Sequence, residues 1–361
     1  MRRGLEPLVL VAAGLVVAVV LFEGLLRLTT EPTLGSGRAF APWLVGQVVF
    51  DPIRGWRNEP GTWSGRRETN GGWVEMTYLV ERHGFRGQEV ADEKPEGVIR
   101  IVCMGDSGTF GTIGVPAKAE SEALMYFSIP SYVDALRERI VREQLDDVEA
   151  VNAGVIGYSS HHGLRQFMVQ IRDLEPDVVT LRFSANDVQP AWGPQHRTVE
   201  PENGLLRFLL YRFSSWRTTR VLLGAYGLPR FHPAPNSLDW ASRDEYGRNL
   251  ERIIERSRER GIRVLLMDYP VRGHWPKLHK MQALTRKIAR RHGVPFLETG
   301  PKLLVDGARG FNAYDTVHPN EYGARLTADL LFQTLGDLGW IGARPPQRSG
   351  HPPTQPRPGE G

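Results

Sequence analysis

The sequence contains a single cysteine, Cys103, among its 361 residues. One cysteine excludes an intramolecular disulfide and any metal site built from clustered thiolates. Its place inside the apolar run IRIVCM makes Cys103 a packing residue. The chain also lacks a basic tract: its net charge is +4, but its arginines stand among acidic residues, as in LERIIERSRERG. This pattern is typical of solvated helix faces and argues against a nucleic-acid-binding protein.

The N-terminal segment lacks the marks of a removable leader. Two arginines precede an apolar stretch from Leu8 to Phe22, and neither an A-x-A-like cleavage site nor a lipidation cysteine follows it. The stretch alone is shorter than the roughly 20 residues that span a bilayer, but apolar residues resume after Glu23. We therefore predict an uncleaved signal anchor over residues 1–28, in preference to a buried core helix. The arginines then place the remaining chain on the outer, periplasmic side of the cell membrane in a single-pass protein.

Composition divides the remaining chain into three parts. Residues 29–97 carry tryptophans among Gly, Pro and Asn, with VEMTYLVE as the one clear alternating run, which predicts a loop-rich accessory layer on the main domain. Residues 341–361 are rich in Pro and polar residues and predict a disordered tail. Between them, residues 98–340 form the predicted main domain, which contains an insertion over 188–242.

The main domain reads as short apolar runs separated by amphipathic helices. Helical spacing of apolar residues covers 164–174, 246–257 and 277–291, and a further helix follows His318. Such alternation predicts a three-layer α/β/α domain with a parallel sheet of about five strands, covered on both faces. The predicted strands are IRIVCM, VEAVNAG, DVVTLRFS, IRVLLMDYP and VPFLE.

Polar residues follow three of these strands directly. Ser107 comes after the first strand, the segment 152–157 after the second and the segment 184–187 after the third. Carboxyl ends of parallel strands share one edge of the sheet, where ligand chemistry collects in such folds. Asp315 and His318 stand three residues apart before the last helix, so the sequence predicts that they meet the other polar residues at this edge.

These residues are those that acyl transfer requires. A serine hydroxyl is a poor nucleophile until a base accepts its proton, and His318 can act as that base for Ser107. Asp315 can orient the imidazole and stabilise the imidazolium. Donors for the developing oxyanion are the backbone N–H groups of Ser107 and Gly157 and the side-chain amide of Asn186. At this point Gly154 is an alternative to Gly157.

Taken in order, these motifs resemble the four blocks of the SGNH, or GDSL, hydrolase family. The resemblance extends over roughly residues 98–340, with Gly108 where the family often has an apolar residue and Ser184 where glycine is common. The four blocks are Gly105-Asp106-Ser107, Gly157 in NAGVIGYSS, Asn186 in SAND, and Asp315-x-x-His318.

The resemblance implies a flavodoxin-like fold and a catalytic centre of Ser107, His318 and Asp315. It further implies an oxyanion hole of Ser107, Gly157 and Asn186, no metal and no cofactor, and esters of lipids or acylated carbohydrates as substrates. Asp187 is then structural rather than catalytic.

Several features have more than one interpretation. The insertion over 188–242 is a lid, a surface helix on the membrane or ordinary packing. The tryptophans at 192, 240 and 275 and those of the early region either stack on sugar rings or pack a loop-rich layer. His161 and His162 are adjacent and do not share a helix face, so we interpret them as surface or rim residues instead of a metal pair.

The sequence as a whole predicts a serine esterase that acts on an O-acyl group of envelope carbohydrate or lipid through an acyl-enzyme intermediate. Two alternatives remain open. One is an O-acyltransferase that uses the same serine on an extracytoplasmic polysaccharide. The other is a carbohydrate-binding or assembly protein that keeps the fold without turnover.

Overall fold

A computed structural model describes residues 6–29, 48–51, 53–69, 72–116, 124–188, 209, 212, 213, 218, 243–305, 309–312 and 314–342. Most of the predicted insertion over 188–242 and of the predicted tail over 341–361 lies outside these residues. Both therefore stay predictions, as does the division of the chain into domains.

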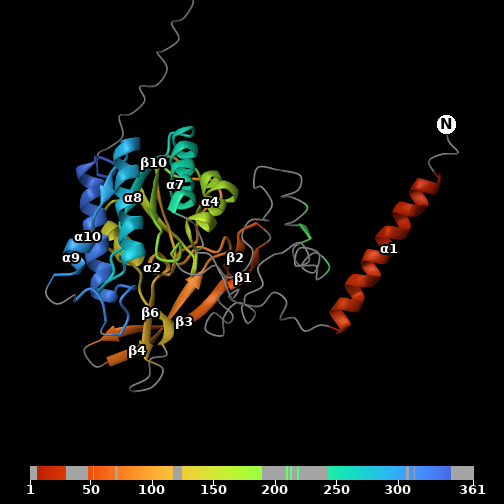
Figure 1. Cartoon of the computed structure of the whole chain (residues 1–361), viewed down its shortest axis with the longest axis horizontal. Coiled ribbons are helices and arrows are strands. Elements are labelled where there is room, and N and C mark those ends of the chain that lie inside the picture. The colour runs from red at the N-terminus through yellow and green to blue at the C-terminus, as the bar shows by residue number, and fades with distance from the viewer. Residues whose placement is uncertain are drawn as a thin grey trace, which may run out of the picture.

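A five-stranded parallel sheet forms the centre of the main domain (Figure 1). Its strands lie in the order β11-β10-β9-β5-β8, and every neighbouring pair is parallel. The sheet confirms the predicted α/β fold, because each predicted apolar run supplies one strand. The strands are β5 (Ile99–Gly105), β8 (Val148–Gly154), β9 (Val178–Arg182), β10 (Arg263–Met267) and β11 (Phe296–Leu297).

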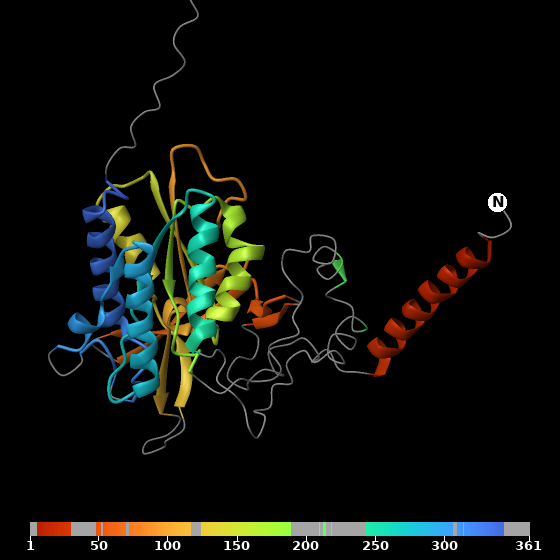
Figure 2. The same cartoon turned by 45° about the horizontal axis from the view of Figure 1, so that its top comes forward.

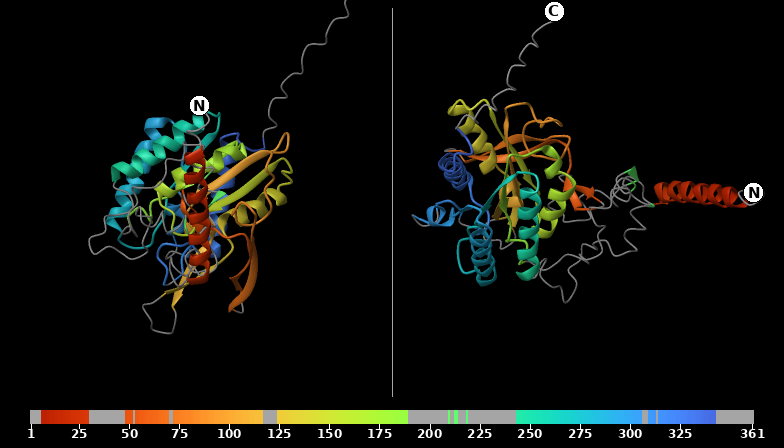
Figure 3. Two further views of the ribbon diagram at one scale, coloured as in Figure 1. Left: turned by 90° about the vertical axis from the view of Figure 1, so that its right-hand side faces the viewer. Right: turned by 90° about the horizontal axis from the view of Figure 1, so that it is seen from above.

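Helices cover both faces of this sheet, as Figure 2 shows. On one face α3 (Tyr132–Arg142) packs against α10 (Glu321–Asp337). On the other face α7 (Arg243–Arg258) lies between α4 (Ser160–Val169) and α8 (Pro276–His292) and contacts both. The result is the predicted three-layer arrangement, which Figure 3 shows from two further directions.

Side chains of β5 alternate between the two cores that these helices form. Ile101 and Cys103 belong to the core beneath α3 and α10, whereas Val102 and Met104 belong to the core beneath α4, α7 and α8. A strand that is buried on both faces must be apolar throughout, which explains its continuous run. Burial also raises the pKa of the Cys103 thiol to about 11, as expected for a packing residue.

The sheet changes direction of winding at β5. From β5 the chain passes through α3 to β8 on one side, while β9, β10 and β11 lie on the other side. Open α/β sheets bind ligands at such a switch point, beyond the carboxyl ends of the strands. The loops after β5 and β9, which carry Ser107 and Asn186, therefore border the expected crevice.

One predicted helix is divided in the structure. The segment 164–174 forms the end of α4 and a separate 3₁₀ turn, η5 (Ile171–Leu174), because Gln170 leaves helical geometry with φ −141° and ψ −59°. Two further short helices are α2 (Ser107–Phe110) and α9 (Gly300–Leu303).

The region before the sheet contains more regular structure than its loop-rich sequence predicts. Strands β1 (Val48–Asp51) and β2 (Gly55–Asn58) form one antiparallel pair, and β3 (Gly61–Thr69) and β4 (Gly72–Val80) form a second. A third pair, β6 (Thr112–Pro116) and β7 (Leu124–Ser128), follows α2. Segments that are neighbours in sequence pair with each other here, and isolated bridges from Arg86 to Val80 of β4 and to Asn152 of β8 link the second pair to the central sheet.

Residues Glu6–Thr29 form helix α1, which Figure 1 shows apart from the main domain. Among the described residues, no helix is both long enough and apolar enough to cross a membrane. The predicted membrane-spanning helix is therefore not confirmed. Glu23 and Arg27 interrupt the apolar residues, and buried Glu23 accepts hydrogen bonds from Arg27 and from the N–H and hydroxyl of Thr218. The extracytoplasmic location stays a prediction.

Ser184, which follows β9, has a backbone conformation that suits glycine better. Its φ is +136°, a region that side chains with a Cβ avoid, and its buried hydroxyl has no hydrogen-bond partner among the described residues. Both features cost free energy: a strained backbone about 1–3 kcal/mol, and an unsatisfied buried hydroxyl a similar amount.

We expect Ser184→Gly to raise the free energy of unfolding by about 1 kcal/mol or more, because relief of strain outweighs the extra entropy of glycine in the unfolded chain. Urea denaturation followed by circular dichroism measures the change. The control is Ser64→Gly at an exposed position in β3, where glycine relieves no strain and is expected to destabilise. A Ser184→Gly protein less stable than wild type would contradict the interpretation.

Candidate active site

Ser107 lies where the chain leaves β5 and turns into α2. Asp106 is the N-cap of this helix, and its carboxylate accepts a hydrogen bond from the Gly108 N–H at 2.8 Å. The Thr109 and Phe110 N–H groups both donate to the Asp106 carbonyl. The turn therefore fixes Ser107 at the first helical position, directly beyond the carboxyl end of the central strand.

The structure brings Ser107, His318 and Asp315 together. The Ser107 Oγ lies 2.7 Å from His318 Nε2, although the two residues are 211 positions apart in the sequence. On the far side of the imidazole, His318 Nδ1 lies 2.7 Å from Asp315 Oδ2. All three residues are buried. This is the geometry of a nucleophile, a base and a residue that orients the base.

Backbone amides hold the Asp315 carboxylate in place. Oδ1 accepts hydrogen bonds from the Val317 and His318 N–H groups, and Oδ2 accepts one from the Gly114 N–H at 2.6 Å. Gly114 lies in β6, and its carbonyl accepts a further hydrogen bond from the Asn312 side chain. Strand β6 therefore positions the acidic residue, a contribution that no local sequence motif indicates.

Opposite charges set the protonation of the His318–Asp315 pair. Burial raises the pKa of Asp315, but the charge of His318 and hydrogen bonds from His318 and Val317 outweigh burial and lower it to about 2. Burial lowers the pKa of His318, but the Asp315 carboxylate more than reverses this and raises it above its ordinary value. Asp315 is therefore ionised at neutral pH, and His318 is a stronger base than a free imidazole.

Tyr269, at the start of the loop after β10, contacts the turn that carries Ser107. Its hydroxyl donates to Asp106 at 3.0 Å. A Cβ at residue 108 would lie 2.7 Å from this hydroxyl, so the Tyr269–Asp106 bond explains why glycine replaces the apolar residue often found there. Burial raises the pKa of Asp106, and the hydrogen bond from Gly108 and the charge of His318 only partly offset this.

Two backbone N–H groups are available as oxyanion donors. Neither the Ser107 N–H nor the Gly157 N–H donates a hydrogen bond to any residue in the part of the chain that the structure describes. Gly157 has φ +81°, which glycine adopts without strain. The alternative donor is used elsewhere, because the Gly154 N–H donates to the Asn152 side chain at 3.0 Å. The geometry therefore favours Gly157 over Gly154.

The Asn186 side chain joins the two segments that carry these donors. Its Nδ2 donates to the Tyr158 carbonyl at 3.0 Å and to Asp106 Oδ2 at 3.2 Å, so both amide hydrogens already have acceptors. In this state Asn186 links Asp106 to the Tyr158 backbone. Its role as a third donor stays a prediction.

Asp187 anchors the N-terminus of α4. Its carboxylate accepts hydrogen bonds from the Ser160 N–H at 3.0 Å and from the Ser160 hydroxyl at 2.6 Å, and Asn249 donates to the same hydroxyl. Burial raises the pKa of Asp187 to about 7, the hydrogen bonds from Ser160 offset this in part, and the charge of Asp106 adds to the increase. These contacts fit the structural role that the sequence predicts for Asp187.

One expectation for the histidines is wrong. His162 is not a surface or rim residue: it is 4% exposed, because its ring packs against Trp56 and Tyr158. Trp56 is 5% exposed, which favours packing over sugar stacking for this tryptophan. Within the described ranges, no group of three or more His, Cys, Asp or Glu side chains is placed to hold a metal ion.

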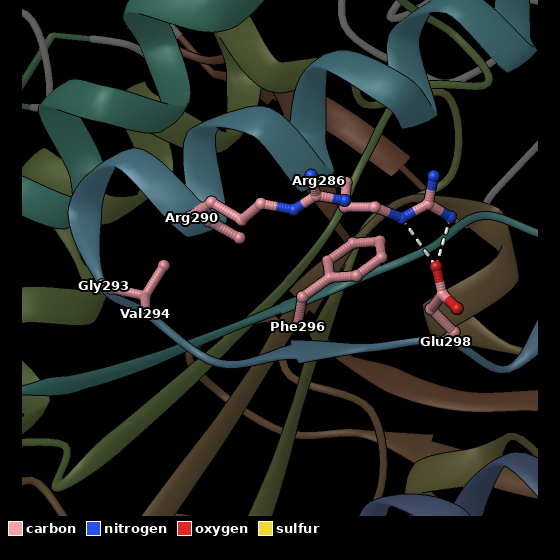
Figure 4. A pocket seen from close by; sticks show the side chains of 7 residues that line it. Arg286, Arg290, Gly293, Val294, Phe296 and Glu298 are labelled. Atoms are coloured by element: carbon pink, nitrogen blue, oxygen red, sulfur yellow. Dashed lines mark hydrogen bonds and ion pairs between the residues drawn. The ribbon is translucent and has the colours of Figure 1, made fainter.

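A surface cleft of about 510 Å³ lies between α8 and β11 and contains none of Ser107, His318 and Asp315 (Figure 4). Arg286 Nε donates to Glu298 at 2.6 Å across this cleft, but both side chains are about 40% exposed. Exposed ion pairs of this kind contribute little to stability. The lining consists of Arg286, Ala289, Arg290, Gly293, Val294, Phe296 and Glu298.

Comparison with known families identifies the class of protein. The family model of the GDSL-like lipases/acylhydrolases matches residues 103–326, more than half of the chain. The chain therefore belongs to the GDSL-like lipase/acylhydrolase family, and this confirms the resemblance seen in its motifs. A search among curated proteins finds no match.

Solved structures with a similar fold include a lipase/acylhydrolase from Enterococcus faecalis, with 17% identity and a TM-score of 0.46 over 69% of this chain and 100% of that one. A GDSL-like lipase from Bacteroides thetaiotaomicron has 17% identity and a TM-score of 0.39 over 66% of this chain and 88% of that one. The acetyl xylan esterase AlAXEase has 16% identity and a TM-score of 0.44 over 66% and 100%.

We expect Asp315→Asn to lower kcat/KM for an ester by about 10⁴-fold, because the neutral amide neither orients nor stabilises the His318 imidazolium. His318 must be neutral to accept a proton, so wild-type activity should rise with pH through an apparent pKa above 6.5. In the variant this limb should shift to lower pH. The control is Asp329→Asn on α10, whose exposed carboxylate pairs with Arg139 on α3. An unshifted pH profile in Asp315→Asn would contradict the assignment.

Asp187 binds a proton more tightly in the folded protein than in the unfolded chain, so the free energy of unfolding should decrease as pH rises from about 4 to about 7. The slope from this group is at most about 1.4 kcal/mol per pH unit. Asp187→Asn keeps an acceptor for Ser160 and should remove this part of the pH dependence. Urea denaturation of both proteins between pH 4 and 8 tests this expectation. Parallel stability curves would show that Asp187 is ionised throughout.

Proposed function

We propose that this protein is a serine esterase that cleaves O-acyl esters through an acyl-enzyme intermediate formed on Ser107. The observation that carries the proposal is the continuous hydrogen-bonded line from Ser107 Oγ through the His318 ring to Asp315, with 2.7 Å at each step. Membership of an acylhydrolase family supports the same reaction class. The N–H groups of Ser107 and Gly157, which have no hydrogen-bond acceptor among the residues that the structure describes, supply the electrostatic stabilisation that an acyl transfer needs.

In the first half of the reaction, His318 Nε2 takes the Ser107 proton while Oγ attacks the acyl carbonyl carbon. The carbonyl oxygen becomes an oxyanion and accepts hydrogen bonds from the Ser107 and Gly157 N–H groups. Asp315 stabilises the imidazolium. The tetrahedral intermediate then collapses, the C–O bond to the alcohol breaks, and His318 returns its proton to the departing alkoxide.

In the second half, the hydroxyl of an acceptor attacks the acyl carbonyl carbon while His318 Nε2 takes the acceptor's proton. The bond between the acyl carbon and Ser107 Oγ then breaks, and His318 returns the proton to Oγ. Water as acceptor gives hydrolysis and releases the carboxylic acid. A sugar hydroxyl as acceptor gives acyl transfer by the same steps. We propose hydrolysis as the main reaction because family membership supports an acylhydrolase. As the substrate class we propose an acylated carbohydrate or lipid outside the cytoplasm.

We expect the purified protein to hydrolyse p-nitrophenyl acetate and to be labelled by a fluorophosphonate. Ser107→Ala should abolish labelling and reduce hydrolysis at least about a thousandfold. Ser64→Ala, which changes an exposed serine in β3, is the matched control and should retain both. Product analysis with an added oligosaccharide acceptor then distinguishes hydrolysis from transfer. If the wild-type protein neither hydrolyses esters nor reacts with the probe, yet binds polysaccharide, the esterase proposal is wrong and a binding protein is favoured.

A further inference from the structure

The loop that carries Gly157 is fastened to strand β2 by three hydrogen bonds. The Asn58 side chain donates to the Gly154 carbonyl at 2.9 Å, and the Trp56 indole N–H donates to the Ile156 carbonyl at 2.9 Å. In the reverse direction, the Tyr158 hydroxyl donates to the Trp56 carbonyl at 2.5 Å. Both chain neighbours of Gly157 are thus bonded to the same tryptophan.

The Trp56 ring also closes the space beside Gly157. A Cβ on Gly157 would lie 3.3 Å from Trp56 Cζ2, a tight contact, so the indole ring lies directly beside Gly157. The ring packs against Tyr158 and His162, with centroids 5.6 Å and 4.5 Å away. Because His162 belongs to the first turn of α4, the indole is fixed between the loop and the helix that follows it.

Strand β2 is itself anchored, so Trp56 is not a loose contact. Asp51 accepts hydrogen bonds from the Ile53 and Arg54 N–H groups and pairs with the Arg54 guanidinium at 2.7 Å. Arg54 also donates to the Gln170 side chain at 2.6 Å, which ties β2 to the end of α4. The segment that contacts the Gly157 loop, from Asp51 to Asn58, is therefore held by hydrogen bonds among buried side chains.

We propose that Trp56 is a positioning residue for the oxyanion hole and that it acts by holding the Gly157 N–H toward the reacting carbonyl. This inference rests on the proposed esterase function. Trp56 touches no reacting atom, so its effect passes through the Ile156–Gly157–Tyr158 backbone. An oxyanion donor stabilises the transition state, and one such donor increases kcat by about 10²–10³-fold. A donor that is displaced or mobile loses part of this rate increase.

We expect Trp56→Phe, which keeps an aromatic ring but loses the indole N–H, to lower kcat/KM for p-nitrophenyl acetate by about 10- to 100-fold. The inhibition constant of a boronic acid, whose tetrahedral adduct on Ser107 places an oxygen in the same hole, should weaken by a similar factor. The control is Trp340→Phe, which makes the same change beyond α10 on the opposite face of the sheet. Thermal unfolding of each variant monitors the fold.

A second variant keeps the proposal testable if Trp56→Phe does not fold. Tyr158→Phe removes only the hydroxyl that bonds the Trp56 carbonyl and should reduce both quantities severalfold. A merely structural contact would change the unfolding temperature without a matched change in kcat/KM and boronic acid affinity. Folded variants whose two constants equal those of Trp340→Phe would overturn the proposal. Absence of Ser107-dependent hydrolysis in the wild type would instead overturn the esterase function, and the inference with it.

Discussion

The hydrogen bond between Ser107 and His318 depends on the order of strands in the sheet. It joins residues 211 positions apart, and it forms because the nucleophile turn follows the central strand β5 while the loop before α10 returns to the same edge. The winding also changes at β5, and open α/β sheets bind ligands beyond the strand ends at such a point. Other contacts surround this one: the Gly114 N–H of β6 donates to Asp315, and Tyr269 and Asn186 donate to Asp106.

The region before the sheet contributes polar contacts to this site from the outside. Arg86 is fully buried and donates to the carbonyls of Phe110 and Gly111 at the end of the nucleophile helix α2. Trp56 and Asn58 do the same for the Gly157 loop. Carbonyls in loops beside an active site need partners when they are buried, and these side chains supply them. An antiparallel layer that looks peripheral in the sequence thereby becomes part of the catalytic scaffold.

The sequence predicts the central fold and the three reactive side chains because both depend on local patterns. Apolar runs of β5, β8 and β9 and the motifs at their ends can be read residue by residue. The contacts of Trp56, Gly114 and Tyr269 cannot be predicted in this way, because each joins segments that are distant in sequence. No spacing rule indicates which donor in one segment meets which acceptor in another. Burial of His162 was missed for the same reason. The apolar N-terminal run predicts a spanning helix, which the described residues do not confirm.

The hydrogen bonds from β2 also bear on what can fold as a unit. The family match begins at residue 103 and the sheet begins with β5, but the carbonyls of Gly154 and Ile156 take their partners from residues 56 and 58. A truncated chain that starts at the sheet would expose Tyr158, His162 and these carbonyls to water and leave the loop free to rearrange. The folding unit is therefore expected to be larger than the segment that matches the family and to include the β1–β2 ribbon.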